Sequence, residues 1–253
     1  MITQNSITKE WIESVAKSNK ADKNLVEKVI RALFLLEGLS ESGLNYVFKG
    51  GTALMLLLNS EKRLSIDIDI IVPEKETDLT EILENICTTK GFTHFETQKR
   101  IAGTNIDKEH YKLFFTSALN NQESHILLDV LKEKNHYQNI IEFPINSTFI
   151  NCEDEPIKVR LPDCNNILGD KLTVFAPNTT GIPYRKGNKE MGMEIIKQMY
   201  DIGCLCDKAD NPEVVSAVFS SFAEKELQEQ ILTKNITNCF SFPLSIIKNH
   251  IFC

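Results

Sequence analysis

Hydrophobic and polar residues alternate strictly over Ser65-Ile-Asp-Ile-Asp-Ile-Ile-Val72, and this period of two predicts a β-strand. A short apolar run at 46–48, bounded by a glycine pair, predicts a buried strand before it. Residues 53–58 are strong helix formers without a breaker, so we expect a helix that begins near Gly50-Gly51-Thr52. The chain is organised around this strand–helix–strand unit.

The rest of the first half mixes helical and strand patterns. Apolar residues at helical spacing predict helices over 7–18, 22–38 and 79–90. Segments rich in β-formers, separated by polar turns, predict strands over 92–100, 110–117 and 124–131. We therefore expect an α/β (α+β) fold with a mixed sheet.

The pattern changes at Pro162. A last short strand is expected at 157–161, and a loop rich in Pro, Thr, Asn and Gly at 177–188. Helical spacing predicts helices over 163–175, 190–207, 211–233 and 243–251. We expect a first region over 1–162 and a helical C-terminal region over 163–253.

Asp67 and Asp69 are the first candidates for chemistry, because a strand places residues two apart on the same face. The strand rise puts them about 7 Å apart along the chain, so both can reach a divalent ion between them. Mg²⁺ is commonly held by one or two carboxylates together with substrate phosphates, and two ions can clamp a phosphoryl displacement. A solvated strand edge is the alternative interpretation of these two residues.

The turn Gly50-Gly51-Thr52 supplies a second candidate feature. Glycines let the backbone approach a ligand closely, and the free N–H groups at a helix start favour an anion. Lys49 adds a positive charge beside the turn. A simple turn remains the alternative, but a glycine turn followed by paired carboxylates is typical of a nucleotide-plus-metal site.

These residues resemble a known superfamily. Gly50-Gly51-Thr52, followed after a gap by Arg63-Leu-Ser65-Ile-Asp67-Ile-Asp69, resembles the DNA polymerase β-like nucleotidyltransferases. Within that superfamily the sequence is most similar to the AbiEii/AbiGii toxin family of type IV toxin–antitoxin and abortive-infection systems. The resemblance implies a polymerase β-like core, with the helical C-terminal region completing the active-site cleft. It also implies nucleotide binding by the glycine turn and Ser65, with Arg63 in support.

The resemblance extends to a third carboxylate. Asp129 lies among apolar residues of the strand expected at 124–131, where a carboxylate is costly to bury without a cation or hydrogen bonds. A solvent-facing strand end is the alternative. Superfamily members carry a third acid on a later strand, and Asp129 matches that position as a metal ligand. Relatives often have Lys two residues earlier, where this chain has Leu127.

Two helical segments of the C-terminal region also match the family. Lys171 corresponds to a helical Lys, and a compact positive charge suits nucleotide phosphates. Lys197 and Asp201 match the last motif as supporting residues, although Gln198 replaces the usual Asp. Lys197 and Asp201 are four residues apart, so an ion pair that only braces the helix is equally open.

Composition narrows the classes of protein. The net charge of −7 argues against a protein that coats nucleic acid through its overall field. Seven cysteines lack the paired spacing of a zinc site, which favours free thiols in a reducing cytosol. No signal peptide or apolar stretch of 18 residues is visible, so we expect a cytoplasmic protein without membrane contact.

The leading hypothesis is an Mg²⁺-dependent nucleotidyltransferase that uses an NTP as substrate and two ions. In this hypothesis Asp67, Asp69, Asp129 and Lys171 are the catalytic residues. The resemblance implies an antitoxin partner and an RNA acceptor such as tRNA. The alternatives are transfer to a small hydroxylated antibiotic or metabolite, and a non-catalytic module that binds nucleotide or a partner.

Overall fold

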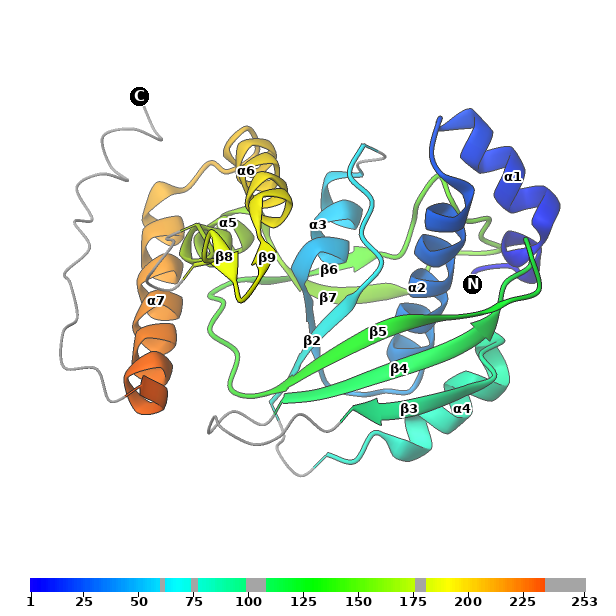
Figure 1. Ribbon diagram of the computed structural model, residues 1–253, viewed down its shortest axis with the longest axis horizontal. Coiled ribbons are helices and arrows are strands. Elements are labelled where there is room, and N and C mark those ends of the chain that lie inside the picture. The colour runs from blue at the N-terminus through cyan, green and yellow to red at the C-terminus, as the bar shows by residue number, and fades with distance from the viewer. Residues whose placement is uncertain (60–61, 74–76, 99–107, 176–180, 235–253) are drawn as a thin grey trace. The chain divides into compact units, whose positions relative to one another are not determined.

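The computed structural model describes residues 1–59, 62–73, 77–98, 108–175 and 181–234 (Figure 1). The chain forms two compact units, which are described separately. Unit 1 consists of Met1–Ile101, Ile106–Asn135 and Ile140–Leu161. Unit 2 consists of Ala102–Asn105, His136–Asn139 and Pro162–Cys253.

Unit 1 contains a five-stranded sheet in the order β1-β2-β5-β4-β3. Its strands are β1 Val47–Lys49, β2 Ile68–Val72, β3 His94–Gln98, β4 Lys108–Thr116 and β5 Glu123–Lys132. β2 and β5 are parallel, and the other three pairs are antiparallel. The predicted mixed sheet is therefore confirmed. β6 (Ile140–Pro144) and β7 (Lys158–Pro162) form a separate two-stranded sheet.

Unit 1 has five described helices, some of which bury one face of the five-stranded sheet. They are the 3-10 helix η1 Gln4–Ile7, α1 Lys9–Ser18, α2 Lys23–Glu41, α3 Gly50–Leu58 and α4 Thr80–Lys90. Alternate sheet residues such as Leu113, Ile126 and Leu128 pack with α2 and α4 in the hydrophobic core. Figure 1 shows α2 and α4 behind the sheet, and no described helix of unit 1 covers the front. The front face is therefore the open face of the sheet.

Local sequence signals set the helix ends. The Asp22 side chain accepts a hydrogen bond from the Leu25 N–H at 2.9 Å, which caps the start of α2. Gly91 ends α4 with a left-handed backbone, φ 74°. The helices predicted over 22–38 and 79–90 are thus confirmed, within a few residues.

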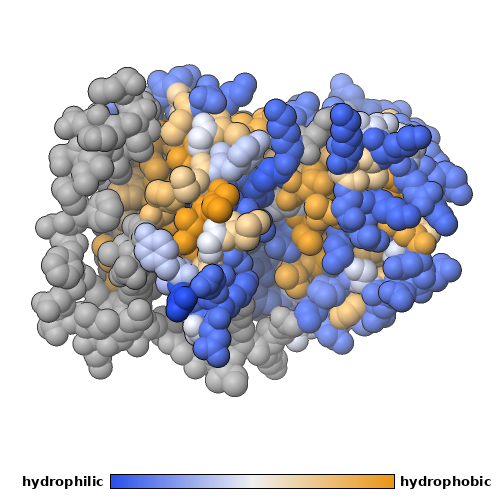
Figure 2. All heavy atoms as spheres, turned by 45° about the horizontal axis from the view of Figure 1, so that its top comes forward, coloured by the Kyte–Doolittle hydropathy of each residue, from blue (hydrophilic) through white to orange (hydrophobic). Residues whose placement is uncertain are grey.

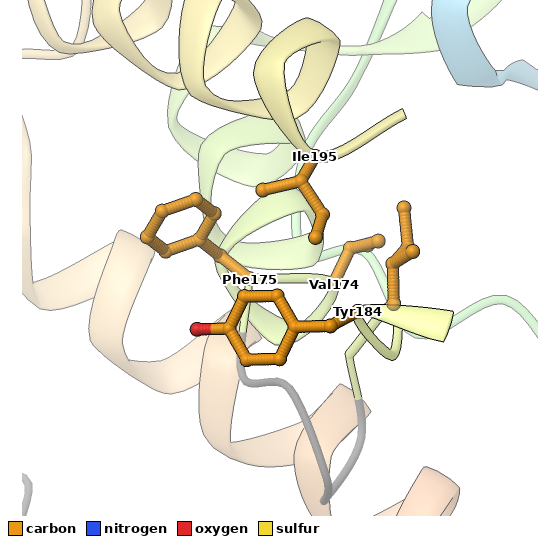
Figure 3. A pocket seen from close by; sticks show the side chains of 5 residues that line it. Val174, Phe175, Tyr184 and Ile195 are labelled. Atoms are coloured by element: carbon orange, nitrogen blue, oxygen red, sulfur yellow. The ribbon is translucent and has the colours of Figure 1, made fainter. Parts of the chain in front are cut away.

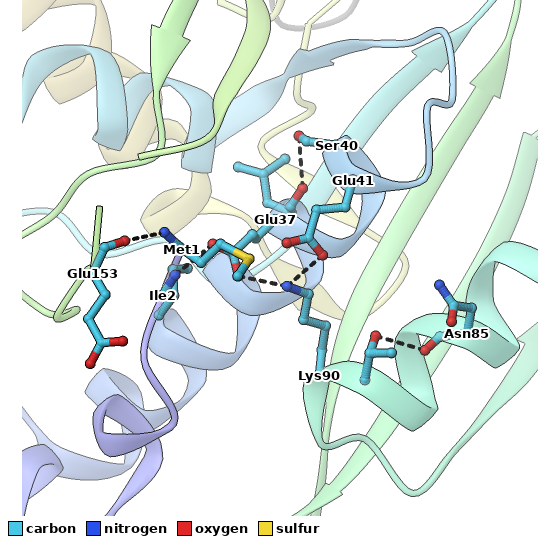
Figure 4. A network of polar contacts seen from close by, with 10 residues as sticks. Met1, Ile2, Glu37, Ser40, Glu41, Asn85, Lys90 and Glu153 are labelled. Carbon is cyan, nitrogen blue, oxygen red and sulfur yellow. Dashed lines mark hydrogen bonds and ion pairs between the residues drawn. The ribbon is translucent and has the colours of Figure 1, made fainter. Parts of the chain in front are cut away.

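A buried charge network ties α2, α4 and the first residues of the chain together (Figure 4). Lys90 Nζ lies 2.8 Å from Glu37 Oε2 and 2.7 Å from Glu41 Oε2. The other Glu37 oxygen accepts a hydrogen bond from the Ile2 N–H at 2.7 Å. Both carboxylate oxygens of Glu37 are therefore occupied, as the burial of a charged group requires.

Unit 2 is mainly helical, as the pattern after Pro162 predicts. It contains α5 Cys164–Thr173, α6 Gly192–Cys206, α7 Pro212–Lys234 and a small hairpin of β8 Arg185–Lys186 and β9 Lys189–Glu190. Asp163 caps α5 by accepting from the Asn166 N–H at 2.9 Å. In the described parts of the chain, no helix has the length and apolar character needed to cross a bilayer.

Three differences from the sequence-based expectations concern the elements. The strand expected over 65–72 begins only at Ile68, so Asp67 precedes β2. β6 was not predicted, and the segment 136–139 belongs to unit 2 rather than to the first region. The helix expected over 243–251 lies outside the described residues.

Candidate functional site

A row of polar residues crosses the open face of the sheet. Asp69 pairs with Lys49 in β1 on one side and with Asp129 in β5 on the other. Asp129 in turn pairs with His110 in β4. Residues directly opposite in a sheet project from the same face. Strand pairing therefore brings two of the predicted carboxylates, Asp69 and Asp129, side by side on neighbouring strands.

Asp69 also lies against the glycine turn. A Cβ atom added to Gly50 would be 2.1 Å from Asp69 Oδ2, so the carboxylate fills the space that a side chain would need. Gly50 has φ +78°, a backbone conformation that favours glycine. The first residue of the turn must therefore be glycine for two independent reasons, and it brings the start of α3 beside a carboxylate.

The other two residues of the turn contact the segment before β2. A Cβ on Gly51 would lie 2.7 Å from Ser65 Oγ and 2.8 Å from Arg63 Nη1. The buried Thr52 hydroxyl donates a 2.6 Å hydrogen bond to the backbone carbonyl of Asp67. The structure thus brings together both halves of the sequence motif, which are separated by about 15 residues of chain.

Asp67 is half-buried and lies just before β2. Its charge acts on His125, a residue of β5 that the sequence analysis did not single out. Burial lowers the pKa of His125, and the positive charges of Lys112 and Lys28 lower it further. The carboxylates of Asp67 and Glu96 raise that pKa, a smaller effect than the burial. His125 is therefore within electrostatic reach of a candidate metal ligand.

His110 is a second site residue that the sequence analysis missed. Its Nδ1 lies 2.6 Å from Asp129 Oδ1, which fixes one oxygen of that carboxylate. Its Nε2 is buried and has no hydrogen-bond partner among the described residues. A single His in a strand carries no sequence signal, because its partner is determined by the pairing of β4 with β5.

The donor chemistry of Asp67, Asp69 and Asp129 fits a hard cation such as Mg²⁺, which takes carboxylate oxygens. The Asp129 side chain is 41% exposed, so its carboxylate is open to solvent. The three do not form a ready cluster, since the described residues contain no group of three or more His, Cys, Asp or Glu side chains arranged around a metal position. Asp69 instead faces Gly50, and Asp129 is hydrogen-bonded to His110.

The three predicted residues of unit 2 are Lys171, Lys197 and Asp201, and an ion pair joins two of them. Lys171 Nζ donates to Asp201 Oδ2 at 2.8 Å and to Gln198 Oε1 at 3.0 Å. Lys171 and Asp201 are both buried. Lys197 is exposed and has no ion pair with a described residue. The alternative of a Lys197–Asp201 ion pair is therefore wrong, because Asp201 pairs across the unit with α5.

Unit 2 also contains a small apolar cavity of about 70 Å³ (Figure 3). It is lined by Val174, Phe175, Ile182, Tyr184 and Ile195. Pockets for small-molecule ligands usually measure about 300–1,000 Å³, so this cavity is too small for a nucleotide. Apolar side chains also gather on the surface over α6 (Figure 2), where Met193, Ile196 and Met199 are more than half exposed.

The site thus combines a glycine turn, a helix start and aligned carboxylates. A comparison with models of protein families identifies the family of the chain. The model described as "Nucleotidyl transferase AbiEii toxin, Type IV TA system" matches residues 31–244. The chain belongs to this family. The match includes the whole glycine turn, all three carboxylates and Lys171. This AbiEii family member is a nucleotidyltransferase, and its type IV toxin–antitoxin class implies an antitoxin partner.

Comparisons with individual proteins add only distant similarities. A search of curated proteins finds no match. The chain is similar to the solved structure of JHP933 from Helicobacter pylori, with 17% identity and a TM-score of 0.49 over 82% of this chain and 78% of that one. It is similar to an antigenic nucleotidyltransferase-like protein from Paracoccidioides brasiliensis, with 13% identity and a TM-score of 0.46 over 84% and 94%. The family assignment rests on the sequence match.

Proposed function

We propose that this AbiEii family member transfers a nucleoside monophosphate from an NTP to a hydroxyl group of an RNA acceptor such as tRNA, with release of pyrophosphate. The observation that carries the proposal is the position of Asp69 between the glycine turn and Asp129. Its carboxylate lies against Gly50 at the start of α3, and it pairs in register with Asp129. Nucleotidyl transfer needs this combination, because the anion site for the phosphates must lie beside carboxylates that can hold a charge-compensating cation.

The contacts support a role for each residue of this proposed site. The start of α3 at Gly50-Gly51-Thr52 presents backbone N–H groups suited to the triphosphate. Ser65 and Arg63 lie against Gly51 at the same helix start, where a hydroxyl and a guanidinium can add hydrogen bonds to phosphate oxygens. Asp67, Asp69 and Asp129 would hold Mg²⁺, which when bound supplies compensation of the phosphate charge.

Asp129 would also orient the acceptor hydroxyl. His110 holds one Asp129 oxygen at 2.6 Å, so the other oxygen of this partly exposed carboxylate remains for the hydroxyl proton or the cation. Lys171 would steady the charge of the nucleotide. Its ammonium group has three donors, and the contacts with Gln198 and Asp201 use two of them.

The proposal is tested with purified protein, Mg²⁺, each α-labelled NTP in turn and total tRNA. Label on tRNA in the presence of the wild-type protein, and none with Asp67→Asn/Asp69→Asn, would support it and identify the base. Glu142→Gln is the matched control, because Glu142 is an exposed carboxylate of β6 in the same unit. Label on a small hydroxylated acceptor and none on RNA would show that the acceptor is a small molecule and would contradict the RNA part of the proposal. Absence of transfer to any acceptor would contradict the proposal.

A further inference from the structure

The open face of the sheet carries a row of aromatic side chains from three adjacent strands. His94 in β3 pairs with Phe114 in β4, which pairs with His125 in β5. The rings of His94 and Phe114 are stacked, with centroids 4.4 Å apart and an interplanar angle of 2°. The His125 ring lies 5.5 Å from Phe114 at a tilt of 48°. We call these three residues the aromatic platform.

The platform lies on the same face as the carboxylates. His125 and Asp129 are four residues apart in β5, so their side chains project from one face. The strand rise places their Cα atoms about 13 Å apart. The charge of Asp67, which precedes β2, already acts on His125. A strand of nucleic acid with its end at the carboxylates could therefore reach the platform within a few nucleotides.

The platform is partly exposed, and its outer ring is held in orientation. His94 is exposed and lies on the edge strand, while Phe114 and His125 are half-buried. The Thr93 hydroxyl lies 3.1 Å from His94 Nδ1 and holds the ring against Phe114. Rings that are ordered before binding lose little conformational entropy when a ligand stacks on them.

Positive charge lies next to the platform. Lys112 lies on the same face, two residues before Phe114 in β4, and its charge acts on His125. Lys112 has no ion pair with a described residue, so its ammonium group can contact a phosphate. Glu96 on β3 is the opposing charge on this face.

We propose that the aromatic platform of His94, Phe114 and His125 binds an unpaired base of the single-stranded acceptor, with Lys112 at a neighbouring phosphate. Single-stranded nucleic acid is commonly bound by aromatic side chains on an open sheet face, flanked by cations that follow the backbone. Flat rings next to an ammonium group match nucleic acid, which offers a base to stack and a phosphate to pair with the charge. This inference rests on the proposed function, because it assigns a position to the acceptor of that reaction.

The test measures the affinity of the full chain for a fluorescent single-stranded RNA oligomer by anisotropy. A second oligomer of equal length has abasic sites in place of bases. We expect the wild-type protein to bind the intact oligomer about tenfold more tightly, in the range for loss of one stacking contact. His94→Ala and His125→Ala should lower this ratio towards one, whereas His94→Phe and His125→Phe should keep it.

Thr97→Ala is the matched control, because Thr97 is exposed on β3 but projects from the opposite face to His94. It should bind both oligomers as the wild type does. Circular dichroism confirms that each variant is folded, and Phe114→Leu replaces any alanine variant that is not. Equal affinity of the wild type for the intact and abasic oligomers would overturn the proposal. Unchanged binding by both His→Ala variants would overturn it too.

The two proposals can fail separately. Base-dependent binding that disappears in the alanine variants, without any nucleotidyl transfer, would support base binding by the platform and contradict the proposed reaction. Transfer to RNA with an unchanged acceptor KM in His94→Ala and His125→Ala would support the proposed reaction and contradict base binding by the platform.

Discussion

Asp69 Oδ2 lies so close to Gly50 that a Cβ atom added to this glycine would be only 2.1 Å from it. The Asp69 carboxylate of β2 therefore lies directly against the backbone of the first residue of α3. This contact explains why a glycine turn and a carboxylate separated by 19 positions belong to one site. The helix start offers backbone N–H groups at the point where the carboxylate is held.

Replacement of Gly50 should therefore cost both stability and activity. Gly50→Ala places a side chain on a left-handed backbone, which costs about 1–2 kcal/mol, and it displaces Asp69 in addition. Gly43→Ala is the control, because Gly43 has φ +74° and nothing within 4 Å of an added Cβ. Urea unfolding should show the backbone cost in both variants, and transfer assays should show lost activity only in Gly50→Ala. Equal effects of the two substitutions would refute the contact.

The Thr52 hydroxyl should support the position of Asp67. Thr52→Val keeps the shape of the side chain but removes the 2.6 Å hydrogen bond to the Asp67 carbonyl. We expect a loss of about 1–2 kcal/mol in the free energy of unfolding, with a lower kcat. Thr88→Val is the comparison, since its hydroxyl bonds a carbonyl on the exposed surface of α4. A Thr52 variant as stable and active as Thr88→Val would contradict this role.

The buried charge network in unit 1 should be among its most sensitive features. Lys90→Met leaves Glu37 without its cation at 2% side-chain exposure, so we expect a loss of about 3–5 kcal/mol by urea unfolding. Adding Glu37→Gln should recover part of this loss, because an amide needs no counter-charge. Lys23→Met breaks the exposed pair with Glu13 and should cost far less than Lys90→Met, because solvent screens this pair. Similar losses in Lys90→Met and Lys23→Met would show that the buried network is not stabilising.

His125 should make stability depend on pH. Its folded pKa lies below the ordinary value near 6.5, because burial and the charges of Lys112 and Lys28 disfavour the protonated form. The unfolded chain therefore takes up the proton first as the pH falls. This contribution to stability is complete above about pH 6.5 and is lost as the pH falls through the folded pKa.

His125→Gln should remove that part of the pH dependence. Its free energy of unfolding should fall less steeply than that of the wild type between about pH 6.5 and 5. Asp67 and Glu96 raise the pKa of His125, so the difference is smaller than burial alone would give. Parallel pH profiles for the two proteins would show that the folded state does not perturb His125.

The hydrophobic pattern could predict the elements and the faces of their residues, but not which strands are neighbours. Alternation in 124–131 identifies Asp129 as a strand residue, yet only the pairing of β5 with β2 and β4 places it between Asp69 and His110. The aromatic platform escaped notice for the same reason, since its three members are widely separated in sequence. Strand register depends on contacts between distant segments, which a single sequence does not contain.

The error at Asp67 has a local cause. The sequence alternates through Ser65, but β1 ends at Lys49, where the chain turns into α3, and no residue of β1 remains to pair with Asp67. The Asp67 carbonyl instead accepts the Thr52 hydroxyl. The Lys171–Asp201 pair was missed because the four-residue spacing within α6 suggested a partner on the same helix, whereas the partner lies on α5.

Nucleotide transfer by Asp69→Asn, compared with the wild type and with Glu142→Gln, tests the central claim most directly. The account predicts that Asp69→Asn remains folded and loses transfer by about a hundredfold or more, because charge compensation at the phosphates is the main source of catalysis. Glu142→Gln should transfer label at the wild-type rate. A folded Asp69→Asn protein with wild-type transfer would contradict the account, since Asp69 joins the glycine turn to the carboxylates.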